Sequence, residues 1–177
     1  MLSNKDRLYI ALYARGVPEE PDTYHWALMV CPKANPRRST RGVRYHVKNT
    51  IQLSGSGRPW VFEQKQLSAF TTQLLLARVL IAKVQNSAAV LRTVQTVPLV
   101  QNDRNWTCRI WVREALAQLN RDGVLGRSKV TNWQAIENKC KQFVASKKAA
   151  GRWRDRGKWK DDETPTWDML QGRETVP

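Results

Sequence analysis

Three strand-like segments lie within the first fifty residues of this 177-residue chain, and they constrain the fold more than any other feature. Leu8 to Ala14, Tyr24 to Cys31 and Val43 to Asn49 are rich in the aromatic, β-branched and aliphatic residues that strands favour. Proline or glycine interrupts the chain between them, so each segment is expected to end in a loop. In the third segment apolar and polar residues alternate, which predicts a strand with one buried face.

The middle of the chain holds one further short strand and a long apolar stretch. The aromatic segment from Trp60 to Glu63 predicts the strand. The apolar stretch from Leu67 to Val84 suits a buried helix or a buried strand equally well. We interpret it as a short helical piece followed by a strand at Arg78 to Val84.

Helices are predicted in the second half of the chain from the spacing of apolar residues and from capping side chains. They run from Ser87 to Thr96, from Cys108 to about Asn120, and from Thr131 to about Lys148. Ser87 and Thr131 are the expected N-caps, and Gln134 would complete a capping box with Thr131. Strands followed by helices predict an α+β fold, in which an antiparallel sheet packs against helices.

Length and composition suit one domain, because 41% of the residues are hydrophobic and can form a core. We expect this domain to span residues 1–148. Residues 149–177 form a basic and aromatic tail that ends with Trp167, Met169 and Leu170, and we expect it to dock on the domain. Three widely spaced cysteines favour a reducing compartment. We find no signal-peptide pattern and no apolar run that could cross a bilayer, so a cytoplasmic protein is predicted.

Cys108 carries the strongest indication of chemistry. It falls in the first turn of a predicted helix, with Asn105 or Thr107 as the cap. A helix N-terminus offers partial positive charge and free amides, which stabilise a thiolate and can bind an oxyanion. Arg104 and Arg109 would add positive potential. These features favour Cys108 as a nucleophile.

The chain contains only two histidines, His25 and His46, and both lie in predicted strands. If these strands are antiparallel neighbours, the two rings can meet across the ladder. His25 would then be the base that takes the thiol proton, and His46 the residue that orients it. Other interpretations stay open: His25 as a half-buried histidine bonded to backbone, His46 as a solvated one, and Cys108 as a buried core residue, which is how we interpret Cys31 and Cys140.

A resemblance to a known superfamily rests on three short motifs. They are Tyr-His-Trp-Ala-Leu-Met-Val at residues 24–30, Tyr-His-Val at 45–47, and Asn-Trp-Thr-Cys at 105–108. Together they resemble the circularly permuted, papain-like NlpC/P60 proteins, above all the lecithin:retinol acyltransferase-like enzymes. The desumoylating PPPDE peptidases share the order of histidine before cysteine. The resemblance implies a permuted papain-like fold and a triad of Cys108 as nucleophile, His25 as base and His46 as its orienting partner.

The resemblance covers residues 24–114 and departs from the acyltransferase-like pattern in three respects. Asn directly precedes Cys in those enzymes, whereas Trp106 and Thr107 intervene here. Their Glu-His-Phe sequence after the cysteine is absent, and we expect no membrane-anchoring tail. We therefore expect a hydrolase of amide or thioester bonds, acting on a peptide, acyl or thioester substrate, rather than a phospholipid acyltransferase. The chain also resembles small fungal proteins of unknown function, which implies no activity.

Non-catalytic binding of nucleic acid is the alternative function. Thirty Lys and Arg against fifteen Asp and Glu give a formal charge of +15, which attracts phosphate backbones and acidic substrates alike. Basic residues interleaved with tryptophan can contact phosphates and stack on bases. The candidates are Arg37, Arg38, Arg152, Trp153, Arg154, Arg156, Lys158 and Trp159. The same residues also fit a solvated surface with packed tryptophans. No metal-ligand spacing, phosphate-binding loop or serine elbow occurs, so no cofactor is predicted.

Overall fold

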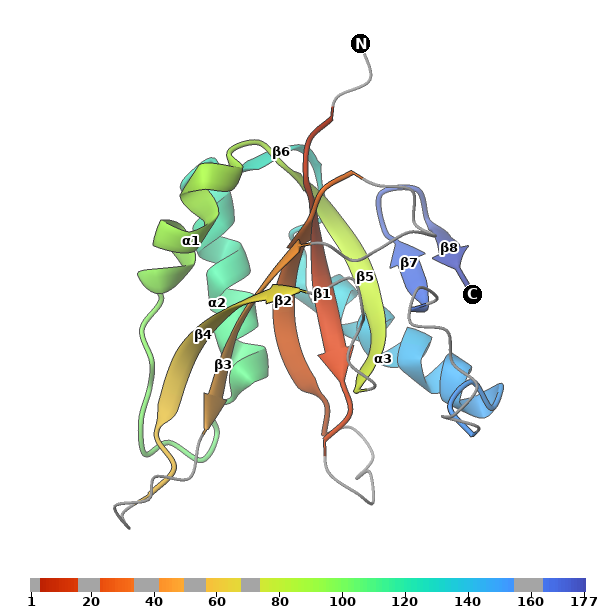
Figure 1. The fold of residues 1–177 in the computed structure, drawn as a ribbon, viewed down its shortest axis with the longest axis horizontal. Helices are drawn as coiled ribbons and strands as arrows, with labels where there is room; N and C mark the ends of the chain where they lie inside the picture. The colour runs from red at the N-terminus through yellow and green to blue at the C-terminus, as the bar shows by residue number, and fades with distance from the viewer. Residues whose placement is uncertain (1–3, 16–22, 34–41, 50–56, 68–73, 155–163) are drawn as a thin grey trace.

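The computed structural model of this protein describes residues 4–15, 23–33, 42–49, 57–67, 74–154 and 164–177. Within these ranges, strands form one sheet and helices pack beside it (Figure 1). The sheet has eight strands, which are mostly antiparallel, and the described helices number three. The predicted α+β class is therefore confirmed.

The sheet begins with four antiparallel strands in chain order. They are β1 (Arg7–Tyr13), β2 (His25–Cys31), β3 (Gly42–Asn49) and β4 (Trp60–Leu67). In space the order is β4-β3-β2-β1, and β1 pairs next with β5 (Leu75–Val84). The sheet continues through β7 (Thr166–Asp168) to β8 (Arg173–Val176), while β6 (Leu125–Lys129) also pairs with β5. The pairing of β5 with β7 is parallel, so the C-terminal segment extends the sheet built by the N-terminal one.

The helices are α1 (Ser87–Gln95), α2 (Cys108–Arg121) and α3 (Trp133–Ala149). Helix α2 packs against β2 and β3, α3 packs against β5, and α1 packs against α2. In Figure 1, α2 and α3 lie behind the strands, so the helices cover one face of the sheet. No helix in the described part of the chain has the length and apolar character to cross a membrane.

Residues 75–77 are strand where we expected helix, and residues 68–73 of the predicted helical piece lie outside the described ranges. Strand β5 already begins at Leu75, so a strand starting at Arg78 is wrong, and β4 extends past Glu63 to Leu67. The reason is that β5 is buried along almost its whole length, by β1 and β7 at its edges and by side chains on both faces. Such a strand shows no alternation of apolar and polar residues, so periodicity cannot separate it from a helix.

Two predicted helix caps are wrong by one residue. Asn86, not Ser87, caps α1, and Asn132, not Thr131, caps α3; each asparagine side chain accepts a backbone N–H of the first turn. Ser87 instead donates its hydroxyl to a carboxylate near the start of β1. Because Asn132 is the cap, the capping box with Gln134 does not form. Neighbouring polar residues compete for this position, and Asn is at least as good a cap as Ser or Thr.

The two faces of the sheet bury different sets of side chains. The main core lies between the sheet and the helices and includes Leu8, Ile10, Leu12, Trp26, Leu28, Val47, Trp111, Leu119 and Ile136. A smaller cluster covers the opposite face and comprises Ala11, Tyr13, Ala27, Met29, Cys31 and Leu75. Alternation along β2 therefore assigns Trp26 and Leu28 to the helix side, and Ala27 and Met29 to the other side. The same alternation decides where the two histidines lie.

Candidate active site

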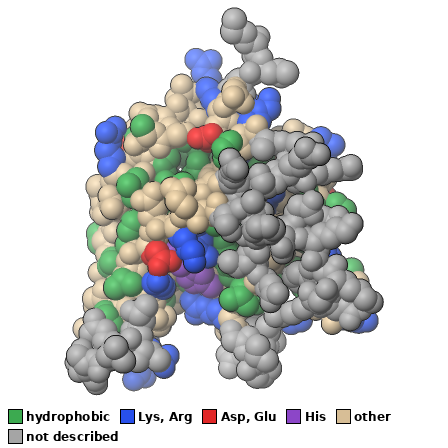
Figure 2. Space-filling view, viewed as in Figure 1, with side chains coloured by type: hydrophobic (Ala, Val, Ile, Leu, Met, Phe, Trp, Pro, Cys, Tyr) green, Lys and Arg blue, Asp and Glu red, His purple; other side chains and the backbone are tan. Residues whose placement is uncertain are grey.

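The side chains of His25 and His46 are in contact. Nε2 of His25 lies 2.6 Å from Nδ1 of His46, and the rings meet edge to face with centroids 4.9 Å apart. The contact arises because β2 and β3 are antiparallel neighbours, and both side chains project from the face away from the helices. Figure 2 shows histidine side chains on that face, beside acidic and basic side chains. The structure thus brings together two of the three residues of the expected triad.

Glu63 extends this pair, and sequence reasoning missed it. The β3–β4 register places Glu63 directly opposite His46, and its Oε1 lies 2.9 Å from Nε2 of His46. Lys48 also pairs with the Glu63 carboxylate, and Arg44 lies 3.5 Å from it. Three residues on three consecutive strands therefore form a line, from Glu63 through His46 to His25. The only sequence signal was an acidic residue in a predicted strand, and that is usual on a solvated face.

The carboxylate fixes which nitrogen of each ring carries a proton. Hydrogen bonds from Lys48 and His46 lower the pKa of Glu63 to about 2, so it is ionised and only accepts. Nε2 of His46 must then donate to Glu63, which leaves Nδ1 of a neutral His46 as an acceptor. That Nδ1 accepts the Nε2 proton of His25. In this arrangement Nδ1 of His25 is left unprotonated, and it is the free basic nitrogen of the line.

Both rings are neutral at physiological pH. Burial lowers the pKa of His25 to about 3, and the neighbouring His46, Arg15 and Arg44 add to this effect. Burial likewise lowers the pKa of His46 to about 4, against the opposing hydrogen bond with Glu63. A neutral imidazole with an unprotonated Nδ1 can accept a proton, whereas an imidazolium cannot.

The sulfur of Cys108 is surrounded by donors. It lies 3.2 Å from Nη2 of Arg15 and 3.5 Å from the backbone nitrogen of Trp26, at the start of α2. Thr107 occupies the N-cap position, as one of the two expected caps, but no side-chain cap hydrogen bond forms there among the described residues. The first amides of α2 therefore stay available to a ligand. A guanidinium, a backbone amide and a helix N-terminus are thus gathered around this sulfur.

Cys108 and His25 approach the beginning of β2 from different sides. The sulfur contacts the amide of Trp26, the residue that directly follows His25, and belongs to the main core. The His25 ring lies toward Tyr13 of the opposite cluster, with ring centroids 6.0 Å apart. Among the described residues, no hydrogen bond joins the sulfur to either imidazole. His25 is the first residue of β2, and the sulfur contacts the amide of the next residue. The path between the ring and the sulfur therefore runs around the beginning of this strand.

The cation beside the sulfur is not one that the sequence indicated. Arg15 follows the end of β1, and nothing in the sequence relates it to Cys108. Arg109, which we expected to add positive potential, instead forms an ion pair with Glu137 of α3. Arg104 lies in the loop before α2 and lines a cavity there. Cys140 is fully buried on α3, in keeping with its predicted core position.

Most of the residues proposed to bind nucleic acid lie outside the described ranges. These are Arg37, Arg38, Arg156, Lys158 and Trp159. The described members, Arg152, Trp153 and Arg154, follow α3, and Trp153 packs against the main core. The nucleic-acid alternative stays a prediction. In the described ranges, no group of three or more His, Cys, Asp or Glu side chains is arranged to hold a metal ion.

Fold and site together define an α+β protein with a cysteine, two histidines and a glutamate gathered around the start of one central strand. The chain belongs to a family of unknown function, DUF6914, which matches residues 5–176. No curated protein and no solved structure matches the chain. The function of this family is unknown, so a function for this protein must be argued from the site.

Proposed function

We propose that this protein is a cysteine-dependent acyl-transfer enzyme of permuted papain-like type, which hydrolyses an amide or a thioester bond. Cys108 is the nucleophile, His25 the base, and His46 holds the His25 ring. The observation that carries the proposal is the line of Glu63, His46 and His25, which leaves a basic nitrogen on the residue next to the Cys108 contact. The carboxylate fixes the protons of both rings, as the third member of a catalytic triad does for its base.

Once the His25 ring and the Cys108 sulfur are in hydrogen-bond contact, the proposed reaction has two stages. Nδ1 of His25 takes the thiol proton, and Sγ of Cys108 attacks the carbonyl carbon of the substrate. The oxyanion that forms accepts hydrogen bonds from the uncapped amides at the start of α2. The C–N or C–S bond then breaks, and His25 returns the proton to the leaving group. In the second stage His25 takes a proton from water, the resulting hydroxide attacks the acyl-cysteine, and the freed thiolate regains that proton.

Substrate must reach the sulfur of Cys108, a residue that is only 1% exposed. The guanidinium of Arg15 lies against it, and Arg15 itself is an exposed residue. Arg15 thus covers the sulfur on this side, and the proposal requires this side chain to move when substrate enters. His25 and the sulfur must also come into hydrogen-bond contact around the end of β2. The three free cysteines fit a reducing compartment such as the cytoplasm.

Acylation by a simple activated ester tests the proposal without knowledge of the substrate. With 4-nitrophenyl acetate, we expect release of nitrophenolate together with an acetyl group on Cys108, located by mass spectrometry of peptides. Cys108→Ala should abolish both signals, and Cys31→Ala, which removes another buried thiol, should leave them unchanged. His25→Asn should slow acylation by about 100-fold.

The proposal fails if Cys108→Ala releases nitrophenolate at the parental rate, or if the acetyl group is found only on lysines. Near-ultraviolet circular dichroism of each variant shows whether its tryptophans keep their packing, so that a folding defect is not mistaken for lost chemistry. Glu63→Gln provides a second variant, in which the replaced side chain is partly exposed to solvent. We expect it to slow acylation less than His25→Asn, because it alters the proton arrangement without removing the base.

A further inference from the structure

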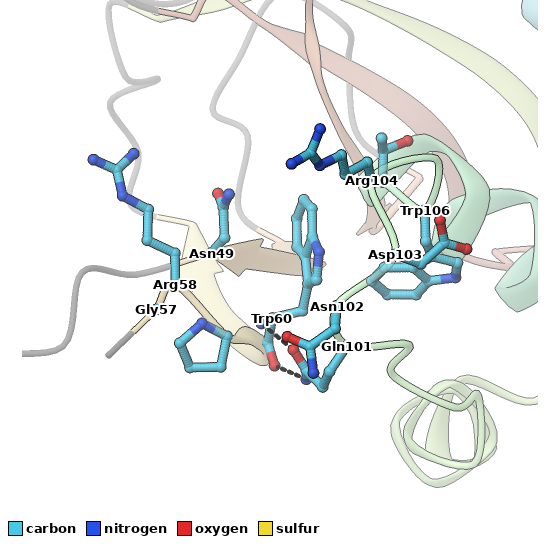
Figure 3. A pocket seen from close by; sticks show the side chains of 11 residues that line it. Asn49, Gly57, Arg58, Trp60, Gln101, Asn102, Asp103, Arg104 and Trp106 are labelled. Carbon is cyan, nitrogen blue, oxygen red and sulfur yellow. Dashed lines mark hydrogen bonds between the residues drawn. The ribbon is translucent and has the colours of Figure 1, made fainter. Parts of the chain in front are cut away.

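A cavity of about 750 Å³ lies directly beside the start of α2 (Figure 3). Trp106 and Thr107, the two residues that precede Cys108, line it on one side. Trp60, the first residue of β4, lines it on another, and the two indole rings meet edge to face with centroids 5.4 Å apart. This volume lies within the range of pockets that hold small organic ligands.

Two hydrogen bonds join the loop before α2 to the start of β4, the segments that carry the two aromatic rings. The side-chain amide of Gln101 accepts the backbone N–H of Trp60 at 2.8 Å and donates to the Trp60 carbonyl at 2.8 Å. Gln101 thereby pairs with β4 as a neighbouring strand would, and it fixes the loop before α2 to the edge of the sheet. Because hydrogen bonds hold these two segments together, the cavity is formed before a ligand binds, which reduces the entropy cost of binding.

The polar side chains of the cavity favour an anion. Arg58 and Arg104 are exposed, and no carboxylate of the described residues forms an ion pair with either. Figure 3 shows their guanidinium groups on the two sides of the Asn49 amide. Asp103, the one acid among the described lining residues, accepts the backbone N–H of Asn105.

One of the two tryptophans also carries an unused donor. Trp106 is 5% exposed, and its indole N–H is buried without an acceptor among the described residues. A buried polar group without a partner costs about 1–3 kcal/mol. That nitrogen has almost no solvent-accessible surface, so a ligand in the cavity does not reach it, and Arg58 and Arg104 are the donors that an anion there can contact.

We propose that this cavity holds part of the substrate next to Cys108, and that this part is a flat apolar group bearing a carboxylate or phosphate. The flat body would lie against the tryptophan wall, and Arg58 and Arg104 would bind the anion. This inference rests on the proposed function, because it names the substrate class of the same site. It adds a binding subsite that the triad residues do not form.

Two disulfide reagents test the inference through the rate at which Cys108 reacts. The dianion 5,5′-dithiobis(2-nitrobenzoate) carries a carboxylate on each of its flat aromatic rings, while 4,4′-dithiodipyridine has flat aromatic rings and is neutral. In both cases the thiolate attacks a disulfide sulfur, a mixed disulfide forms, and one aromatic thiolate leaves. We expect the double variant Arg58→Gln/Arg104→Gln to react about tenfold more slowly with the anionic reagent and at the parental rate with the neutral one.

The matched control is Arg92→Gln/Arg121→Gln, which removes the same charge from exposed positions on α1 and α2 outside the cavity. It should leave both rates within about twofold of the parent. If the control slows the anionic reagent as much as the cavity variant does, general attraction by the +15 charge explains the effect and the inference is overturned.

Binding measured without the thiol separates this inference from the proposed function. On a Cys108→Ala background, isothermal titration calorimetry should show binding of 4-nitrobenzoate but not of 4-nitrobenzamide, and the binding should be lost when Arg58 and Arg104 are replaced by Gln. Equal binding of the two compounds overturns the inference. If the anion binds as expected but Cys108 of the parent reacts with neither disulfide reagent, the cavity assignment stands and the proposed function falls.

Discussion

Acidification from pH 7 to pH 5 should destabilise this protein through His25 and His46 alone. Burial holds their pKa values at about 3 and about 4 in the folded state. In an unfolded chain a histidine has a pKa of about 6.5. As the pH falls through that value, the unfolded chain binds two protons that the folded protein does not bind, and the folded state loses stability. The chain has no other histidine, so nothing else of this kind titrates in the range.

The size of the effect follows from the same pKa values. For each histidine, the free energy of unfolding falls by about 2 kcal/mol between pH 7 and pH 5, so the pair accounts for roughly 4 kcal/mol. The total stability of a domain is about 5–15 kcal/mol, so this loss is readily measured. Glu63, whose pKa is lowered to about 2, stabilises the folded state above the pKa of an unfolded carboxyl group. Its contribution is lost only at lower pH and does not obscure the result.

Urea unfolding at the two pH values, followed by tryptophan fluorescence, measures this difference directly. The variants His25→Gln and His46→Gln should each show about half of the parental pH dependence, and the double variant should show almost none. Each variant is compared with itself at the two pH values. Any loss of stability that the substitution causes at both pH values therefore cancels. The reasoning is refuted if the double variant loses as much stability between pH 7 and pH 5 as the parent does.

Three further predictions concern the fold. Asn132→Ala should cost about 1 kcal/mol of stability in thermal melts through loss of the α3 cap, whereas Thr131→Ala should be nearly neutral; the reverse order would restore Thr131 as the cap. Gly42→Ala should destabilise the protein by about 2 kcal/mol in urea, because the added Cβ would lie 2.4 Å from a carbonyl oxygen of β2, and an unchanged midpoint would show that β3 shifts freely. Native Cys31 and Cys140 should resist N-ethylmaleimide until the protein unfolds, because burial raises the pKa of both thiols, that of Cys31 to about 11; labelling of either in the native state would contradict their burial.

Local sequence patterns were enough to predict most of the helices and strands. The candidate site, in contrast, depends on contacts between residues that are distant in the sequence. The meeting of His25 and His46 could be expected, because each lies in a short predicted strand and the two strands follow one another in the chain. Glu63 could not be placed, since its contact with His46 depends on the β3–β4 register. Arg15 reaches Cys108 across 93 positions of sequence, and no periodicity reports such a contact.

The same limit explains the errors in the fold. Strand β5 is buried on both faces, so its composition does not distinguish it from a buried helix. Strand β7, which contains Trp167, is only three residues long and pairs in parallel with β5. So short a segment carries too little alternation to be recognised, and its docking was expected only from its apolar residues. The helix stripes were easier, and Ile136, Cys140 and Phe143 are all buried as the spacing predicts.

The rate of alkylation of each cysteine by iodoacetamide, measured in the native protein by peptide mass spectrometry, tests most directly whether Cys108 and His25 act together. We expect Cys108 to react fast near neutral pH, while Cys31 and Cys140 react far more slowly. His25→Ala should slow Cys108 and leave the other two thiols unchanged. Equal rates for all three thiols, or a Cys108 rate that is the same with and without the His25 ring, would contradict the account.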